Sequence, residues 1–209
     1  MQQTLSTPYA SMLPPNTARL TVDQYHRMLK AGVLKEGAPL ELRRGVLTFK
    51  NRSARGADPM TVGENHIYVV NLLNELSAAL HSHGCFIQTQ NPVVVQPNHE
   101  PEPDGAVLRG TIRDYKGRKA EPRDVLALIE VSDTSLEDDQ TDKLSEYADS
   151  GIEHYIIINI PERQIEVFEQ PQKGSGKYAQ SRVYKLGEIL PIPVADGKTF
   201  QIPVKDLLP

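Results

Sequence analysis

Cysteine is nearly absent from this sequence, and tryptophan is missing altogether. The only thiol is Cys85, and one thiol can form neither an intrachain disulfide nor a cysteine-based zinc site. This agrees with a reducing compartment, and we expect a cytoplasmic protein. No run of about 18 apolar residues occurs, so neither a membrane-spanning helix nor a membrane partner is predicted. The N-terminus lacks the basic and apolar regions of a secretory signal.

Excess positive charge is also lacking, as are two common hydrolase motifs. The formal net charge is −4 at pH 7, whereas a protein that coats nucleic acid through bulk charge is usually basic. Any contact with nucleic acid must therefore come from local patches. No His-x-x-x-His pair and no Gly-x-Ser-x-Gly motif occurs, which disfavours a zinc hydrolase and a serine hydrolase.

The chain does contain a regular succession of helix and strand patterns. Its 209 residues, 39% of them apolar, predict a single domain over 1–209, with a loose arm at 1–19 and a core at about 62–168. Thr21 and Gln24 match a capping box, and Arg44-Gly45 marks a hairpin. The predicted elements are helices at 21–31, 62–83 and 136–150, a hairpin at 40–49, and strands at 85–88, 92–95, 104–108, 124–132, 155–158 and 165–168.

The predicted core follows the order helix, strand, strand, strand, helix, strand, which indicates an α/β domain. Its long helix at 62–83 has apolar residues at spacings of three and four, namely Ile67, Val70, Leu73, Leu76 and Leu80. The strand at 124–132 is apolar almost without a break, which predicts that both of its faces are covered. Short strands and turns are expected after Phe168.

Two acidic residues stand out against this apolar background. Glu130 is the one polar residue between Val125 and Val131, and burying an unpaired carboxylate costs on the order of several kcal/mol. A salt bridge, or exposure at the strand end, would also explain it. Asp104 follows a proline at the mouth of a neighbouring strand, where it could instead cap a Pro-Asp-Gly turn. If both carboxylates point at one spot, a cation must separate them, and oxygen ligands suit Mg²⁺ or Mn²⁺.

Lys143 is the third candidate, 13 residues after Glu130 by numbering (143 − 130). A helix that packs back on the sheet can aim this lysine at the carboxyl end of the strand. There it could contact a phosphate oxygen or orient a water molecule. The alternative is a solvent-facing lysine that pairs with Asp139 four positions earlier.

These residues carry a resemblance that extends from about Thr21 to Phe168. The matching strings are Pro103-Asp104, Glu130-Val131-Ser132, Asp139-x-x-x-Lys143, Tyr147 and Gly151-Ile152-Glu153-His154-Tyr155. They resemble the Uma-type restriction endonuclease family of the PD-(D/E)XK nuclease superfamily. The resemblance implies a restriction-endonuclease-like α/β core with a mixed central sheet, flanked by an N-terminal helix and hairpin and by C-terminal strands.

The resemblance also implies a function and a site. The function is a metal-dependent DNA endonuclease that hydrolyses phosphodiester bonds. Asp104, Glu130 and Lys143 would be catalytic, and Asp104, Glu130 and the carbonyl of Val131 would hold Mg²⁺ or Mn²⁺. The superfamily pattern has a lysine at the position that is Ser132 in this chain. The Uma-type pattern resembles one in which the lysine lies on the following helix, and Lys143 matches that position. If Lys143 does not take the role of this lysine, the site is inactive.

Three further residues match family positions, and basic residues supply a candidate DNA surface. His66 could touch phosphate or a metal-bound water, Asp139 could orient Lys143, and Glu41 lies in a Glu-x-x-x-Gly string of unassigned role. Structural or solvent-exposed roles remain open for each. We expect DNA as partner and a homodimer that presents two sites. The candidate DNA-contacting residues are Arg109, Arg113, Lys116, Arg118 and Lys119 in the loop 109–123, and Lys50, Arg52 and Arg55 in a second patch.

Other interpretations remain open at this point. The basic loops could simply be solvated. The protein could be a nuclease-fold module that binds nucleic acid without cutting it, or an interaction protein with a degenerate site. Each alternative keeps the buried sheet and loses the metal ion, so metal binding would separate them.

Overall fold

The computed structural model describes residues 14, 16–35, 37–49 and 63–209. Most of the predicted arm at 1–19 and all of residues 50–62 lie outside these ranges. The first elements are α1 (Val22–Lys30), β1 (Leu40–Arg43) and β2 (Val46–Phe49). Both hydrogen bonds of the capping box at Thr21 are present. Arg44 and Gly45 have φ of 46° and 82°, as a tight hairpin turn between β1 and β2 requires.

A six-stranded mixed sheet forms the centre of the molecule, in the order β3-β4-β5-β6-β7-β8. Only β5 and β6 run parallel, and the other neighbouring strands are antiparallel. The predicted order helix, strand, strand, strand, helix, strand is confirmed by α2, β3, β4, β5, the helical segment at 136–150 and β6. The strands are β3 (Cys85–Thr89), β4 (Gly105–Arg109), β5 (Val125–Ser132), β6 (His154–Asn159), β7 (Gln164–Gln172) and β8 (Lys177–Lys185).

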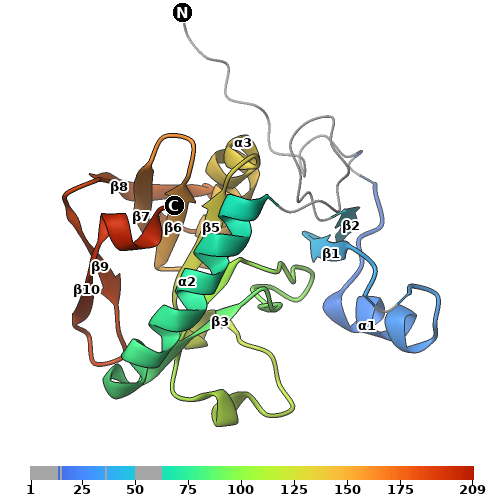
Figure 1. Ribbon diagram of the computed structural model, residues 1–209. Coiled ribbons are helices and arrows are strands. Elements are labelled where there is room, and N and C mark those ends of the chain that lie inside the picture. The colour runs from blue at the N-terminus through green and yellow to red at the C-terminus, as the bar shows by residue number, and fades with distance from the viewer. Residues whose placement is uncertain (1–13, 15, 36, 50–62) are drawn as a thin grey trace, which may run out of the picture.

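Each face of the sheet carries its own apolar layer. Helix α2 (Glu64–Leu80) packs on one face, and Figure 1 shows the C-terminal strands β9 (Ile189–Pro193) and β10 (Thr199–Pro203) beside it. The other face is covered by the helical segment 136–150, whose Tyr147 packs with Leu128 and Tyr155. Every residue of β5 is buried, as its unbroken apolar run predicts, and each large apolar side chain buried there contributes about 1.5–3 kcal/mol.

Four details differ from the sequence-based expectations. Residues 92–95 form no strand: Val93 makes a single bridge to Ala120, and Pro92 has no N–H to donate to a ladder. Ile67 is 49% exposed, and Val69 is buried in its place. The C-terminal part contains β8, nine residues long, rather than short strands alone. The predicted helix 136–150 is α3 (Leu136–Asp138), a π-helix η5 (Asp139–Lys143) and α4 (Leu144–Ser150).

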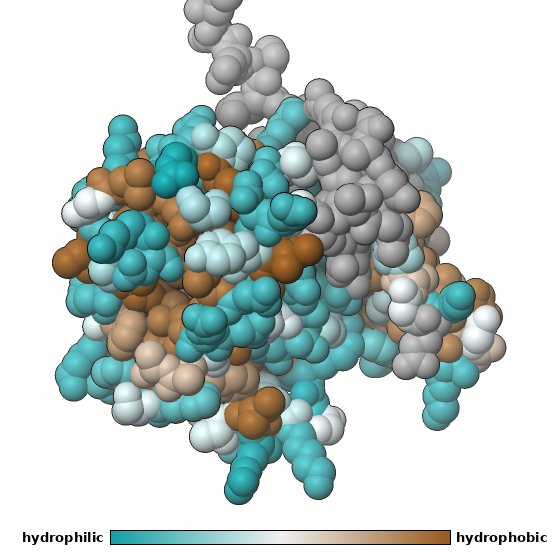
Figure 2. Space-filling model, viewed as in Figure 1, coloured by the Kyte–Doolittle hydropathy of each residue, from teal (hydrophilic) through white to brown (hydrophobic). Residues whose placement is uncertain are grey.

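The N-terminal helix and hairpin dock on the segment that leads to β4. The Glu100 N–H donates to the Leu42 carbonyl at 2.7 Å, and Arg43 forms ion pairs with Asp138 and Glu146. Hydrophilic residues interrupt the apolar patches on the face shown in Figure 2. Within the described ranges, no helix is long and apolar enough to cross a membrane.

Candidate active site

Asp104 and Glu130 lie side by side at the junction of β4 and β5. The antiparallel register pairs Gly105 with Ile129, which brings the residue before β4 opposite Glu130. The Asp104 carboxylate accepts a hydrogen bond from the Val131 N–H at 2.9 Å. Glu130 is only 1% exposed, so it does not protrude at a solvated strand end. The structure thus brings together the two acids that the sequence singles out.

Gly105 allows α2 to approach this junction closely. A Cβ at this position would lie 3.1 Å from Leu73 Cδ1 and 3.3 Å from Ile129 Cβ, so a larger residue would push the helix away from the strand. Because Gly105 is the first residue of β4, the string Pro103-Asp104-Gly105 enters a strand here. Asp104 therefore points its carboxylate across to β5 instead of capping a turn.

His66, near the start of α2, bridges two oxygens of the site. Its Nε2 lies 3.0 Å from Asp104 Oδ1, and its Nδ1 lies 3.0 Å from the Val131 carbonyl oxygen. Since both ring nitrogens face acceptors, a protonated ring donates to both of them, and these contacts favour the charged form. Burial disfavours that charge, but the hydrogen bond and charge of Asp104 outweigh it and raise the pKa of His66. Burial likewise opposes ionisation of Asp104, and His66 outweighs it, so the pKa of Asp104 is lowered.

Lys143 supplies the second positive charge. Its Nζ lies 3.0 Å from Glu130 Oε2 and 2.8 Å from Asp139 Oδ1, with 18% of its side chain exposed. Burial works against its charge, but Asp139 and Glu130 raise the pKa of Lys143 well above its ordinary value. Burial raises the pKa of Glu130 well above its ordinary value. The charge of Lys143 works against this increase, and the charges of Asp104 and Asp139 add to it. The lysine therefore faces the site rather than solvent.

A π-helix carries both Lys143 and Asp139. Single π-turns inside α-helices are rare and frequent at functional sites, and this one spans Asp139 to Lys143. Asp139 is fully buried and accepts hydrogen bonds of 2.5 Å from the hydroxyls of Ser132 and Ser135. Ser132 thus holds the aspartate that pairs with Lys143.

Two tyrosines complete the site, and the sequence-based interpretation missed their hydroxyls. Tyr147 Oη donates to Glu130 Oε1 at 2.7 Å, and Tyr155 Oη donates to the Asp139 carbonyl oxygen at 2.9 Å. In the sequence-based interpretation, Tyr147 is part of the resemblance, with no role for its hydroxyl. Its position four residues after Lys143 was the available signal, because residues four apart share one face of a helix.

Glu41 lies outside this cluster but supports the strand that carries Asp104. Its Oε2 accepts a hydrogen bond from the Glu102 N–H at 3.3 Å, two residues before Asp104. The β1–β2 hairpin is thereby tied to the chain that enters β4. The Glu-x-x-x-Gly string thus acts through backbone positioning.

The predicted basic surface is only partly available. Arg118 pairs with Asp124 at 2.6 Å and stacks on Tyr115, Lys119 pairs with Glu100, and Arg109 donates to the Ala195 carbonyl at 3.3 Å. Arg113 and Lys116 are exposed and have no ion pair among the described residues. Lys50, Arg52 and Arg55 lie outside the described residues.

The donor set fits a hard, largely hydrated divalent cation. In the described part of the chain, no group of three His, Cys, Asp or Glu side chains is arranged to hold a metal ion. Asp104, Glu130 and the Val131 carbonyl nevertheless offer two carboxylates and a peptide oxygen at one junction. Mg²⁺ binds through one or two carboxylates and keeps several waters, whereas a structural zinc site needs four protein ligands. These residues therefore suit Mg²⁺ or Mn²⁺ better than zinc.

A second buried charge cluster connects the hairpin to α4. Arg43 Nε lies 2.9 Å from Glu146 Oε2, and His99 Nε2 lies 3.6 Å from the same oxygen. The Arg44 N–H donates to His99 Nδ1, so the proton of the neutral ring sits on Nε2. Burial raises the pKa of Glu146 to about 7 despite Arg43, and burial with the charges of Arg43 and Arg44 lowers the pKa of His99 to about 3.

Glu146→Gln should flatten the fall in stability between pH 5 and pH 8. A carboxyl whose pKa is raised in the folded state stabilises the fold below its unfolded pKa, and this contribution is lost as pH rises through about 7. At about 1.4 kcal/mol per pH unit, the parent should lose up to about 3 kcal/mol that the variant keeps. Urea denaturation at both pH values measures this. The pKa of His99, about 3, lies below this pH range, so His99 does not titrate within it. If the free energies of unfolding of parent and variant fall equally between pH 5 and pH 8, the raised pKa of Glu146 is contradicted.

Comparisons with known proteins agree with this fold. A crystal structure from Anabaena variabilis, described as a "putative nuclease belonging to DUF820", matches with a TM-score of 0.56 and 16% identity, covering 90% of this chain and 97% of that chain. At that identity the match shows a shared fold. No curated protein sequence matches the chain. The family model Uma2, described as "Putative restriction endonuclease", matches residues 22–205. The chain therefore belongs to the Uma2 family.

Proposed function

We propose that the protein is a metal-dependent endonuclease that hydrolyses phosphodiester bonds of DNA. One observation carries this: Asp104 and Glu130 meet at the β4–β5 junction, and Lys143 reaches Glu130 from the helical segment behind it. Burying several carboxylates in one place is costly unless cations compensate them. Asp104, Glu130 and Val131 are the proposed metal ligands, and Lys143 is the proposed catalytic lysine.

Each residue then has a distinct role. When bound, Mg²⁺ would polarise the scissile phosphate and lower the pKa of a coordinated water. Lys143 would orient the attacking water and stabilise the negative charge that grows on the phosphate. Asp139, fixed by Ser132 and Ser135, positions the lysine. His66 neutralises the oxygens of Asp104 and Val131 while no metal ion is present, since its ring donates to both.

DNA would be contacted through exposed cations of the loop 109–123. Arg113 and Lys116 are the best candidates, because Arg109, Arg118 and Lys119 already have partners within the protein. Contacts of this kind reach the phosphate backbone and are weakened by salt. The homodimer that would cut both strands remains a prediction.

A non-cutting nucleic-acid-binding module is the second candidate. It is favoured by the fact that His66, Lys143 and Tyr147 already partner the acidic side chains of the site. A site whose charges are satisfied by its own side chains can persist without a metal ion. The two candidates differ in one property, which is the ability to bind a divalent ion and cut.

Purified protein should cut plasmid, single-stranded or branched DNA with Mg²⁺ or Mn²⁺ and leave each substrate intact with EDTA. Comparison of the three substrates on gels also identifies the preferred DNA structure. Mn²⁺ binding, measured by calorimetry, reports on the site without cleavage. A protein that binds DNA but neither binds Mn²⁺ nor cuts would be the non-cutting module.

A further inference from the structure

Arg43, on the N-terminal hairpin, binds two acids of the helical segment 136–150. Its Nε lies 2.9 Å from Glu146 Oε2, and its two terminal nitrogens donate to the Asp138 carboxylate at 3.1–3.3 Å. Only 13% of the Arg43 side chain is exposed. A planar guanidinium presents a rigid fork of donors, so it can serve two carboxylates at once. The arginine therefore holds the two acids in one relative position.

The two acids stand on opposite flanks of the π-helix that carries Lys143. Asp138 is the residue just before η5, and Glu146 lies three residues after its end (146 − 143). A π-helix bonds each residue to the fifth one along instead of the fourth, so it takes up one extra residue. Each residue turns an α-helix by about 100°. Loss of the π-turn would therefore rotate one flank against the other by about that angle.

The proposed catalytic cluster takes its residues from both sides of this π-turn. Asp139, at the first position of η5, pairs with Lys143 at its last position. Lys143 also meets Glu130, to which Tyr147 of α4 donates. A rotation of α4 against the start of η5 would carry Lys143 and Tyr147 away from their partners. The angle between the two flanks therefore decides where the lysine points.

The neighbouring Arg44 makes contacts of the same kind on one side of the π-turn. It pairs with Asp149 at 2.9 Å and donates to Ser145 Oγ at 3.2 Å, and both partners belong to α4. Within the part of the chain that the structure describes, the side chain of Arg44 thus attaches the hairpin to α4 without spanning η5. The two arginines separate the bridging of the π-helix from simple attachment of the hairpin.

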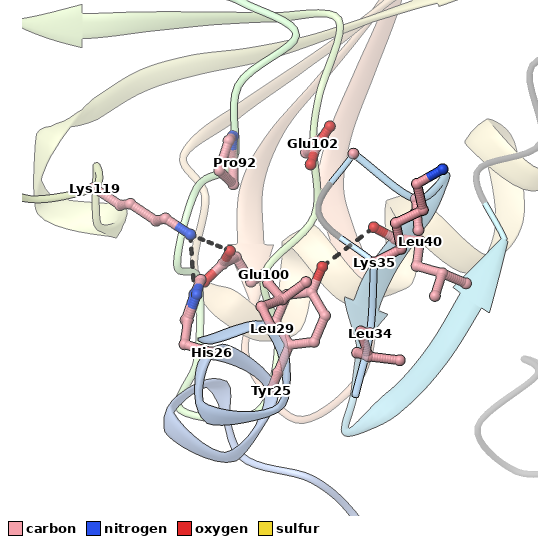
Figure 3. A pocket seen from close by; sticks show the side chains of 12 residues that line it. Tyr25, His26, Leu29, Leu34, Lys35, Leu40, Pro92, Glu100, Glu102 and Lys119 are labelled. Atoms are coloured by element: carbon pink, nitrogen blue, oxygen red, sulfur yellow. Dashed lines mark hydrogen bonds and ion pairs between the residues drawn. The ribbon is translucent and has the colours of Figure 1, made fainter. Parts of the chain in front are cut away.

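The hairpin is also anchored to α1 and to the segment before β4. Figure 3 shows His26 of α1 and Lys119 together at the carboxylate of Glu100, beside a cavity of about 180 Å³. These polar groups partner one another and so tie α1 to this segment. The N–H of the same Glu100 donates to the carbonyl of Leu42, the residue before Arg43. The backbone from which Arg43 reaches the helical segment is therefore held in place.

We propose that Arg43 is a positioning residue that keeps Lys143 directed at Glu130. It does so by bridging Asp138 and Glu146 across the π-helix. The role of the lysine in cleavage rests on the proposed nuclease function, whereas its position rests on the contacts of Arg43. Because π-turns are rare within α-helices, relaxation toward α-helical hydrogen bonding is the expected result when the bridge is lost.

Asp138→Ala and Asp138→Asn form a matched pair that tests the bridge. Both remove the same negative charge, but asparagine keeps an oxygen that accepts from Arg43. Because 34% of the Asp138 side chain is exposed, both variants should fold. At saturating DNA and Mg²⁺, Asp138→Ala should lower kcat by about 10²-fold, as a displacement of about 1 Å in an active site can, with KM unchanged. Asp138→Asn should cut nearly as fast as the parent.

The affinity for Mn²⁺, measured by calorimetry without DNA, gives a readout that does not depend on cleavage. In the parent, the ammonium group of Lys143 contacts the Glu130 carboxylate that would hold the metal ion, so the two cations compete for it. Asp138→Ala should release Lys143 from Glu130 and bind Mn²⁺ more tightly than Asp138→Asn does. A general loosening of the fold would instead weaken the binding of Mn²⁺.

Arg43→Lys and Arg44→Lys repeat the test from the hairpin. Each variant keeps the positive charge, but the single ammonium group at position 43 cannot span both acids as the guanidinium does. Arg43→Lys should therefore lower kcat as Asp138→Ala does, and Arg44→Lys should cut like the parent. Equal kcat values in the two Asp138 variants, or equal losses in the two lysine variants, would overturn the proposal.

Crystal structures of the metal-free Asp138 variants separate this proposal from the nuclease function. The distance from Lys143 Nζ to Glu130 Oε2 is 3.0 Å in the parent. It should lengthen in Asp138→Ala and stay the same in Asp138→Asn. If the parent cuts DNA while the distance is unchanged in Asp138→Ala, the nuclease stands and the bridge fails. If the parent neither binds Mn²⁺ nor cuts, while the distance lengthens in Asp138→Ala alone, the nuclease fails and the bridge stands.

Discussion

Glu130→Gln is expected to abolish metal-dependent cleavage, with a rate loss of at least about 10³-fold, equivalent to about 4 kcal/mol of lost transition-state stabilisation. The substitution preserves the shape of the side chain and an oxygen that can accept the hydrogen bond from Tyr147. It removes the negative charge that would hold the metal ion against Asp104, and it puts an amide nitrogen in place of the oxygen that faces Lys143. Asp104→Asn should act in the same direction for the same reason.

The fold should survive this change, and a matched control can show it. Glu166 on β7, two strands from Glu130 in the sheet, is also buried and is hydrogen-bonded by Gln140 and Asn159. Glu166→Gln should cut like the parent. Thermal unfolding and Mn²⁺ calorimetry of both variants separate loss of the ion from loss of the fold. A Glu130→Gln protein that cuts at the parent's rate would remove Glu130 from the proposed mechanism.

The elements that were correctly predicted have strong local signals. Glu130 is conspicuous because a single acid interrupts an apolar strand, and a buried carboxylate always demands a partner. The helix that carries Lys143 follows that strand directly, so the meeting of the two residues depends on only a short stretch of chain. The capping box at Thr21 and the hairpin turn at Arg44-Gly45 are likewise set by neighbouring residues.

The features that were missed depend on contacts between distant segments. His26 meets Glu100 across 74 positions, and Arg43 meets Glu146 across 103. No periodicity within one segment reports such pairs. The high β-propensity of the valines at 93–95 predicts the strand at 92–95. This prediction is wrong because tertiary packing decides β-structure more than propensity does. The π-turn at Asp139 also leaves no clear mark in a helical pattern.

Lys143→Met is expected to reduce cleavage by about 10²–10³-fold, as the loss of one group that stabilises transition-state charge does. It should also lower the stability of the metal-free protein. Lys143 contacts both Glu130 and Asp139 with only 18% of its side chain exposed, and removing one partner of a buried ion pair costs about 3–5 kcal/mol. Lys177→Met, at an exposed position on β8, is the control and should change neither property.

The response of Lys143→Met to Mg²⁺ distinguishes a metal site from a purely structural ion pair. If Asp104 and Glu130 hold a metal ion, saturating Mg²⁺ compensates the carboxylates that the lysine leaves behind, and ligand binding to the folded state raises its stability. Urea denaturation with Mg²⁺ and with EDTA should then show a larger stabilisation by Mg²⁺ in the variant than in the parent. If the ion pair only braces the helix against the sheet, Mg²⁺ restores nothing. A loss of stability that is the same with and without Mg²⁺, together with unchanged cleavage, would assign Lys143 to the scaffold.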